Sequence, residues 1–211
     1  MNKNRQTAVA FASRLLLLYK DTGFIFFSAC MKKKRIVISG SPGAGKTTLV
    51  EELKKLGYPT FDEYSRTLIE AAKKEGKNQY FLSDPQEFSE ALFTGRKKQF
   101  EAFEELQIDS RFVFFDRGIH DIYAYLMAIG KDSQFWHDRV SKFQYDLVFL
   151  LAPWKKIYKI DAQRTETFEE AMHYFPFIKT VYDQTHKIIL IPEGSVASRI
   201  AFIQAKLKSY E

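Results

Sequence analysis

The chain has 211 residues, of which 45% are hydrophobic and 27% are charged, and this suits one folded domain with a full-sized core, or one domain plus a tail. Its formal net charge is +6, but half of that excess falls in the first 30 residues and no dense basic stripe with interleaved aromatic residues follows, so we expect no nucleic-acid partner. A single cysteine, Cys30, excludes an intrachain disulfide and a CxxC metal site, and it favours a reducing cytoplasm.

The segment 1–31 does not resemble the rest of the chain. Its apolar runs are interrupted by Arg14, Lys20 and Asp21, so none approaches the ~18 apolar residues of a spanning helix, and we expect no membrane span. No clear small-residue cleavage site precedes MKKKRIVISG, which argues against a signal peptide. Met31 is an alternative start, and residues 1–31 are interpreted as an extension from an upstream start or a disordered tail. A weak amphipathic contact with a membrane is the alternative.

Strand and helix patterns alternate from residue 32 onward. The run RIVIS (35–39) is continuous and β-branched, which is typical of a strand buried on both faces. Apolar residues recur at helical spacing over 47–56, and Gly57 ends that helix. Four later apolar runs also predict strands, at 58–61, 111–116, 145–151 and 187–192.

Helices are predicted between these strands. One covers 65–76, and Asp84 with Pro85 marks the start of a long amphipathic helix that continues through 95–106. A further helix begins in DRGIHDIYAYL, and Ser195 is expected to cap the last one. Strands separated by helices indicate a parallel sheet with right-handed crossovers and helices on both faces. We therefore predict one α/β domain over 32–211, a three-layer sandwich with a five-stranded, mainly parallel sheet.

The segment 38–49, ISGSPGAGKTTL, contains the complete phosphate-binding pattern G-x-x-x-x-G-K-[ST], with a predicted strand before it and a predicted helix after it. In such a P-loop, backbone N–H groups and the positive end of the helix face the phosphates. Lys46 is expected to reach the β- and γ-phosphates, and the Thr47 hydroxyl to bind Mg²⁺. The predicted nucleotide-binding residues are Gly40, Ser41, Pro42, Gly43, Ala44, Gly45, Lys46, Thr47 and Thr48.

Three other positions favour a small-molecule kinase among P-loop proteins. Asp116 ends a buried strand, where a carboxylate can hold the metal; the alternative is an Asp that caps the next helix. Glu63 follows the second strand and is the candidate to orient and deprotonate an acceptor hydroxyl; the alternative is a helix-initiating acid pair with Asp62. Arg164 lies in the expected lid after the fourth strand, where it can stabilise the transferring phosphoryl group. The guanine-reading motif N-K-x-D of GTPase switches is absent.

The segments GSPGAGKTTL, EYSR, VFFDRGIHDIYAYL, RTETFEEA and LIPEGSVASRIAFI together resemble the NadR-like AAA-type family, which includes the nicotinamide riboside kinase domain of NadR proteins. The resemblance spans roughly 35 to 205. It implies a P-loop kinase-type fold that uses ATP or GTP with Mg²⁺ and phosphorylates a nucleoside-like hydroxyl. It also assigns Gly45, Lys46 and Thr47 to the phosphate loop, Asp116 to the metal, Glu63 and Arg66 to the E-Y-x-R segment, and Arg164 to the lid. The adenylyltransferase and DNA-binding domains of NadR proteins have no counterpart in this chain.

Several further residues are weaker candidates. Arg117 can bind phosphate or substrate, and His120 with Asp121 can contact the acceptor, although a lone helical histidine is more often a structural hydrogen-bonding group. Arg96 and Gln99 lie on the long helix that can wall the acceptor pocket. The segment 192–196 is placed to contact the adenine, the lid lysines Lys155, Lys156 and Lys159 are interpreted as solvated, and Trp136 and Trp154 are interpreted as packing residues.

The leading hypothesis is a cytoplasmic, Mg²⁺-dependent phosphotransferase that binds ATP or GTP and a small hydroxyl-bearing acceptor of the nucleoside type. The alternatives are an NTPase whose acceptor is water, and a regulatory module that senses nucleotide and has no small-molecule acceptor. Spacing along the chain does not specify the acceptor or the oligomeric state.

Overall fold

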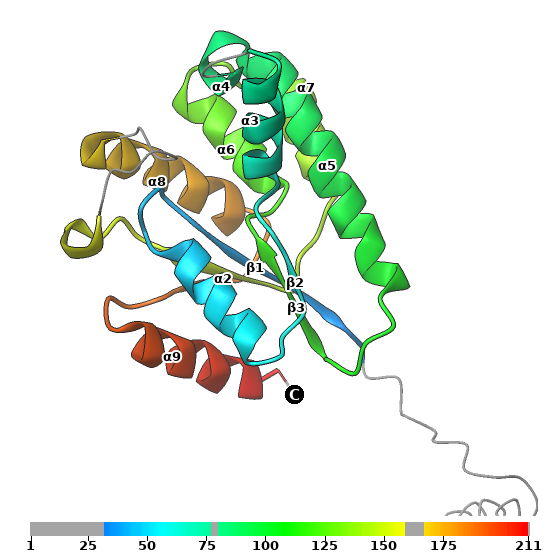
Figure 1. The fold of residues 1–211 in the computed structure, drawn as a ribbon, viewed down its shortest axis with the longest axis vertical. Helices are drawn as coiled ribbons and strands as arrows, with labels where there is room; N and C mark the ends of the chain where they lie inside the picture. Colours follow the sequence, from blue (N-terminus) through cyan, green and yellow to red (C-terminus); the bar gives the residue numbers. More distant parts are fainter. Residues whose placement is uncertain (1–31, 77–79, 159–166, 211) are drawn as a thin grey trace, which may run out of the picture. The chain divides into compact units, whose positions relative to one another are not determined.

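The computed structural model describes residues 32–76, 80–158 and 167–210; the predicted extension 1–31 and the lid residues Lys159 and Arg164 lie outside them. Five strands form one sheet in the order β2-β3-β1-β4-β5, and every neighbouring pair is parallel (Figure 1). This confirms the predicted parallel sheet. The strands are β1 (Lys34–Gly40), β2 (Thr60–Phe61), β3 (Phe112–Asp116), β4 (Leu147–Leu151) and β5 (Ile188–Leu190).

The four later strands are shorter than the apolar runs that predicted them, and β2 and β5 are half as long as predicted, whereas β1 extends beyond the run 35–39 at both ends. Tyr58 and Pro59 belonged to the predicted strand, but only the two residues of β2 pair with β3. Pro59 has no N–H to donate, although its carbonyl accepts a hydrogen bond from Phe114 N at 2.9 Å. The ring of Tyr58 instead packs edge-on against Phe114, so this residue contributes to the core and does not pair in the sheet.

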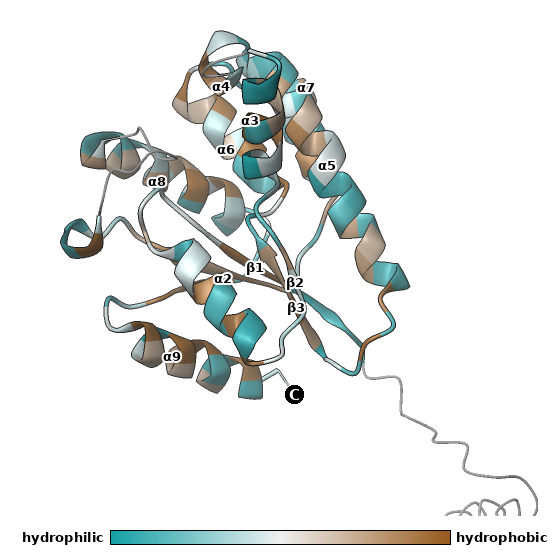
Figure 2. Ribbon diagram, in the orientation of Figure 1, coloured by the Kyte–Doolittle hydropathy of each residue, from teal (hydrophilic) through white to brown (hydrophobic). Residues whose placement is uncertain are grey.

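Helices cover both faces of the sheet, as predicted. The side chains of β1 alternate between the two faces: Ile36 and Ile38 join the core beneath α2 and α9, whereas Val37 joins the core beneath α5, α6 and α8. The hydrophobic residues concentrate on the strands and on the helix faces turned toward them (Figure 2). The helices are α2 (Lys46–Lys55), α3 (Tyr64–Lys74), α4 (Tyr80–Ser83), α5 (Pro85–Glu105), α6 (His120–Ala128), α7 (Gln134–Val140), α8 (Phe168–Asp183) and α9 (Val196–Lys208), with a 3₁₀ turn, η1 (Lys155–Ile157).

The predicted helix starts have the expected caps. Asp84 accepts a hydrogen bond from Glu87 N at 2.9 Å with Pro85 in the first turn of α5, and Ser195 accepts one from Ser198 N at 3.1 Å. The short helices α4 and α7 were not predicted. Together with α3, α5 and α6 they enclose a third apolar cluster, which includes Trp136. Within the described ranges, the chain has no helix that is both long and apolar enough to cross a membrane.

Candidate active site

The phosphate loop connects the central strand β1 to α2, and two glycines set its shape. Gly40 has φ 140°, and a Cβ there would lie 2.2 Å from the carbonyl oxygen of Leu151 on β4. Gly45 has φ 86° and forms the N-cap of α2. Side chains are rarely accepted in either conformation, so the loop needs glycine at both positions. The N-terminus of α2 is thereby aimed at the site where the motif predicts phosphate.

Lys46 lies folded over its own loop. Its Nζ donates to the carbonyl oxygens of Gly40 at 2.9 Å and Ser41 at 2.7 Å. Burial, with repulsion from Arg117, lowers the pKa of Lys46 to about 7, and the nearby carboxylates of Asp116 and Glu63 oppose part of that effect. A phosphate is a stronger partner for an ammonium than two carbonyls are, so this side chain is ready to exchange them for phosphate oxygens.

Asp116 and Thr47 offer oxygen ligands beside Lys46. Asp116 ends β3 opposite Ile38 of β1, and its Oδ1 is buried with no hydrogen-bond partner among the described residues. Burial, aided by the charge of Glu63, raises the pKa of Asp116 to about 6, and the charge of Lys46 limits the rise. The Thr47 hydroxyl accepts a hydrogen bond from Arg66 Nη2 at 2.8 Å. A buried carboxylate oxygen without a partner and a hydroxyl at the loop fit the hard oxygen ligands that Mg²⁺ takes in phosphate sites.

The described residues contain no group of three or more His, Cys, Asp or Glu that could bind a metal ion without other ligands. A phosphate-bound Mg²⁺ takes one or two protein groups and its remaining ligands from phosphate and water, and Thr47 with Asp116 fits that requirement.

Glu63 lies between two guanidinium groups at the side of the loop. Its Oε1 accepts a hydrogen bond from Arg96 Nη2 at 2.7 Å, and its Oε2 is 2.5 Å from Arg117 Nε. Burial acts to raise the pKa of Glu63, but the charges of Arg96 and Arg117 outweigh it, so the pKa is lowered and the carboxylate stays ionised. Glu63 is also the N-cap of α3 and accepts from Ser65 N at 3.3 Å. The capping alternative is therefore observed, and it does not displace the carboxylate from the site.

Arg117 is fixed by a second carboxylate beneath it. Among the described residues it is the one non-glycine residue with positive φ, at 69°. Its Nη1 donates to Asp121 Oδ1 at 2.9 Å. Asp121 also accepts from Ser39 Oγ at 2.5 Å and from the Tyr182 hydroxyl at 2.6 Å. An unfavourable backbone conformation persists only where the surroundings hold it, and here the guanidinium is held by Glu63 on one side and Asp121 on the other.

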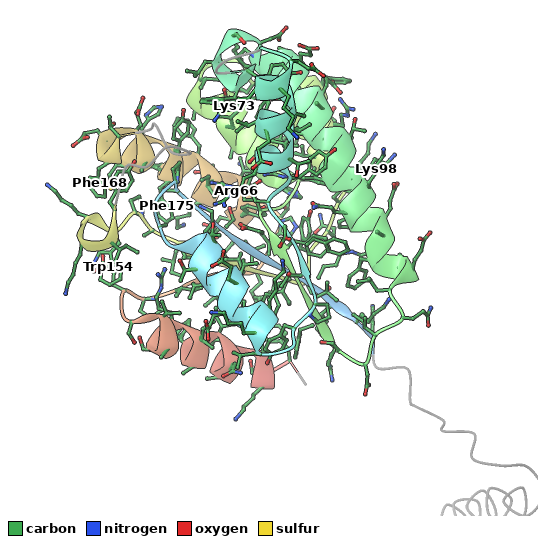
Figure 3. All side chains as sticks on the ribbon, viewed as in Figure 1. Arg66, Lys73, Lys98, Trp154, Phe168 and Phe175 are labelled. Carbon is green, nitrogen blue, oxygen red and sulfur yellow. The ribbon has the colours of Figure 1, made fainter. Side chains whose placement is uncertain are left out.

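A cleft of about 830 Å³ runs over the loop and brings these groups together. Its floor contains Lys46, Thr47, Asp116 and Arg117, and one wall is the face of α3 that carries Arg66 and Lys73 (Figure 3). The other wall is formed by Trp154, Lys156 and Ile157 after β4 and by Gly194, Ser195, Val196 and Arg199 near the start of α9. The cleft is large enough for a nucleotide and part of an acceptor.

The structure therefore brings most of the predicted site residues to one cleft. Pro42, Gly43, Gly45, Lys46, Thr47, Thr48, Glu63, Arg66, Asp116 and Arg117 line it, and so does part of the predicted adenine segment. Gly40, Ser41 and Ala44 do not line the cleft; they shape the loop from behind, with Ala44 in the core. The lid position Arg164 lies outside the described residues.

Four of the weaker candidates are placed differently from their predictions. His120 is 1% exposed and does not line the cleft, so its ring has a structural place and does not contact an acceptor there, but neither ring nitrogen has a described hydrogen-bond partner. Arg96 lies beneath Glu63 and does not line the cleft. Gln99 donates to the Asp62 carbonyl at 2.9 Å. Trp136 packs in the core as predicted, whereas Trp154 lines the cleft.

The residues that sequence reasoning missed are Arg199 in the cleft wall and the Asp121 partners Ser39 and Tyr182. No spacing rule indicates them, because each reaches the site from a different element. A family model described as an AAA domain matches residues 35–199, which include the phosphate loop and the whole cleft. The chain belongs to this AAA domain family.

Solved structures with a P-loop kinase fold resemble the AAA domain of this chain. A deoxyadenosine kinase from M. mycoides is 22% identical over 83% of this chain and 99% of its own, with a TM-score of 0.58. A thymidylate kinase from Ehrlichia chaffeensis is 17% identical over 83% and 99%, with a TM-score of 0.56. A NadR protein in complex with NR is 15% identical over 84% of this chain and 50% of its own, with a TM-score of 0.62.

These structures confirm the predicted P-loop kinase-like fold and the resemblance to NadR proteins at the level of the fold. This chain spans about half the length of the NadR protein that it matches. No curated protein matches the chain.

Proposed function

We propose that the AAA domain, taken as residues 32–211, is a Mg²⁺-dependent phosphotransferase that moves the γ-phosphoryl group of ATP, or of GTP, to a hydroxyl of a nucleoside-like acceptor. The observation that carries this proposal is the position of Glu63, an ionised carboxylate held by two guanidinium groups in the cleft that contains the phosphate loop. A plain nucleotide-binding module has no need of such a carboxylate there. The similar solved structures include enzymes named as deoxyadenosine and thymidylate kinases, which supports the proposal.

The residues of the loop would bind the triphosphate. Backbone N–H groups and the Lys46 ammonium would contact the phosphate oxygens, and Thr47 with Asp116 would hold Mg²⁺. The bound metal would supply neutralisation of the charge on the β- and γ-phosphates. Arg66 donates to the Thr47 hydroxyl in this structure, so it would turn from that hydroxyl toward the γ-phosphate or the acceptor as the nucleotide binds. Arg164, in the predicted lid, would add a further cation when the cleft closes.

Glu63 would position the acceptor more than it would deprotonate it. Its lowered pKa makes it a weak base, but its ionised oxygens can accept a hydrogen bond from the attacking hydroxyl and direct it at the γ-phosphorus. Phosphoryl transfer passes through a loose transition state that needs little deprotonation before attack. The hydroxyl proton would pass to Glu63 late in the transfer, while Arg96 and Arg117 keep the carboxylate in place.

The test is transfer from radiolabelled γ-phosphoryl ATP to a pooled set of nucleosides with Mg²⁺ present. The wild-type protein should give labelled product, and Lys46→Ala should give none. Glu63→Gln should slow transfer by ~10²-fold or more while leaving nucleotide affinity within a few-fold. Asp62→Asn is the matched control, because Asp62 is the adjacent carboxylate, is exposed and pairs with Lys54 on the surface; it should behave as wild type.

Each other result separates the alternatives. Free phosphate without labelled acceptor identifies an NTPase whose acceptor is water. Binding without either product identifies a nucleotide-sensing module. Normal transfer in the Glu63→Gln variant contradicts the role given to that carboxylate. A cytoplasmic location, where ATP and Mg²⁺ are available, suits the proposed chemistry.

A further inference from the structure

Arg199 reaches the phosphate loop from α9, which is distant in sequence but packs beside α2 (Figure 1). It lies one turn into α9, and its backbone N–H bonds to the carbonyl of the cap residue Ser195 at 3.0 Å. Its side chain is buried, with 5% of the residue exposed, and its Nη2 donates to the carbonyl oxygen of Ala44 at 3.1 Å. The same residue lines the cleft. Arg199 is thus a buried arginine at the edge of the proposed triphosphate site.

Gly45 provides the room that the Arg199 guanidinium occupies. A Cβ at Gly45 would lie 3.0 Å from Arg199 Nη1 and 3.2 Å from Ile157 Cδ1. The guanidinium therefore lies directly over the Cα of the residue that precedes Lys46. In a phosphate loop this is where successive N–H groups turn toward the phosphates. The absence of a side chain at Gly45 allows both the turn and the close approach of the cation.

The charge of Arg199 has no carboxylate partner among the residues that the structure describes. The two other arginines near the cleft differ: the buried Arg96 pairs with Glu63, and the half-buried Arg117 pairs with Glu63 and Asp121. Arg199 has one described hydrogen bond, to a carbonyl, and its Nε is buried without a partner. Burial lowers the pKa of Arg199, and the more distant charge of Glu193 only partly opposes this. Buried charges in proteins are normally paired, and the described residues leave this one without a counter-charge.

We propose that the missing counter-charge is the phosphate chain of the nucleotide, and that Arg199 is the second buried cation of the triphosphate site, beside Lys46. This inference rests on the proposed function only in requiring a nucleoside triphosphate at the loop. Arg199 would act in two ways at once: Nη2 braces the loop through the Ala44 carbonyl, and the remaining N–H groups and the charge attract the phosphates. A guanidinium suits this double role because its five donors are arranged in a rigid fork.

Two variants separate the charge from the brace. Arg199→Gln removes the charge but keeps an amide N–H group that can donate to the Ala44 carbonyl. Arg199→Lys keeps the charge but offers a single flexible ammonium. Lys208→Met is the matched control, because it removes an exposed cation from the same helix away from the cleft. Thermal unfolding of each variant checks that it is folded.

Affinities are measured by titration calorimetry for Mg·ATP and for Mg·tripolyphosphate, which has no base or sugar. We expect Arg199→Gln to weaken both by about 10- to 100-fold, the range for a lost charge-assisted hydrogen bond. Arg199→Lys keeps the charge without the fork, so it should lose less affinity than Arg199→Gln, and Lys208→Met should match the wild type. Equal affinity of wild type and Arg199→Gln would overturn the inference, and so would a loss for ATP alone, which would place Arg199 against the base. A larger loss in Arg199→Lys than in Arg199→Gln would assign Arg199 to the brace only.

The same titration distinguishes this inference from the proposed function. If the wild-type protein binds neither Mg·ATP nor Mg·tripolyphosphate, the nucleotide-dependent function itself is contradicted. If the wild type binds both and Arg199→Gln binds them equally well, only the role of Arg199 is contradicted. If Arg199→Gln fails to fold, Arg199→Met replaces it as the variant without the charge, and a folded Arg199→Met that binds both ligands as tightly as the wild type contradicts the role of Arg199.

Discussion

Replacing His120 with phenylalanine should make the domain less sensitive to acid. His120 begins α6, is 1% exposed, and has no described hydrogen-bond partner at either ring nitrogen. Its ring packs edge-on against His186, with centroids 4.4 Å apart, and lies 5.3 Å from the ring of Tyr182. Burial, and secondly repulsion from His186, lowers the pKa of His120 from 6.5 to about 3. A proton on this imidazole is therefore shielded from bulk water, and no described residue accepts a hydrogen bond from it.

The direction in which pH changes the free energy of unfolding depends on whether the folded or the unfolded chain binds the proton more readily. The unfolded chain protonates His120 near pH 6.5, whereas the folded domain does so only near pH 3, so the neutral ring stabilises the fold above pH 6.5. Between these values, acidification favours the unfolded chain, and by pH 5 His120 should lower the free energy of unfolding by about 2 kcal/mol. His186, with its pKa lowered to about 4 by burial, acts in the same direction. Asp116 acts in the opposite direction, because its folded pKa is raised to about 6.

The assay is urea unfolding of wild type and His120→Phe at pH 7.5 and at pH 5.0. Contributions of Asp116 and His186 are present in both proteins and largely cancel, so wild type should lose about 2 kcal/mol more than the variant over this interval. His173, an exposed histidine on α8, provides the control: His173→Gln should lose as much stability as wild type. Equal losses in wild type and His120→Phe would show that the buried ring is protonated without penalty and would refute the reasoning.

Gly95→Ala should lower the free energy of unfolding by about 1–3 kcal/mol, because its Cβ would lie 1.8 Å from Tyr64 Cε1; an unchanged melting temperature would show that the ring moves aside freely. Asp121→Asn should lower the free energy of unfolding by about 2 kcal/mol, because Arg117 keeps Glu63 as a carboxylate partner and the cost stays below that of breaking a buried pair completely. The same variant should lower the rate of transfer more than the affinity for ATP. A variant with an unchanged rate would show that Asp121 does not position Arg117. Thr167→Ala removes a capping box at the start of α8 and should cost about 1 kcal/mol in urea unfolding; no change would mean that solvent satisfies the freed N–H groups equally well.

The fold was predictable because its determinants are local. A β-branched run such as 35–39 can be buried on both faces only in the middle of a sheet, and β1 is the central strand. Asp84 and Ser195 indicate helix starts because a cap bonds to N–H groups only two or three residues away. The length of the second strand was overestimated because an apolar residue such as Tyr58 indicates burial and not strand pairing. Tyr58 is partly buried by packing against Phe114, and it forms no strand pairing there.

The site residues were predictable only where they lie together in one continuous segment of the sequence. The phosphate loop is a continuous motif, so its residues and their roles can be read in order. The pair of Arg96 with Glu63 joins residues from α5 and from the loop before α3, and the bond of Arg199 to Ala44 spans 155 positions of sequence. Such contacts depend on the packing of elements, which spacing along the chain does not specify. His120 illustrates the same limit, because a histidine in a helix looks alike in sequence whether its ring faces water or other rings.

The position of β1 also determines when the domain can fold. This strand is made first, yet its two neighbours are β3, where Lys34 is opposite Phe112, and β4, where Ile36 is opposite Leu147. A nascent chain must therefore carry an unpaired, strongly apolar strand through most of its synthesis before the sheet can close. Ribosome-bound chains that end before β4 should remain protease-sensitive and associate with chaperones, and protection should appear once β4 has left the exit tunnel.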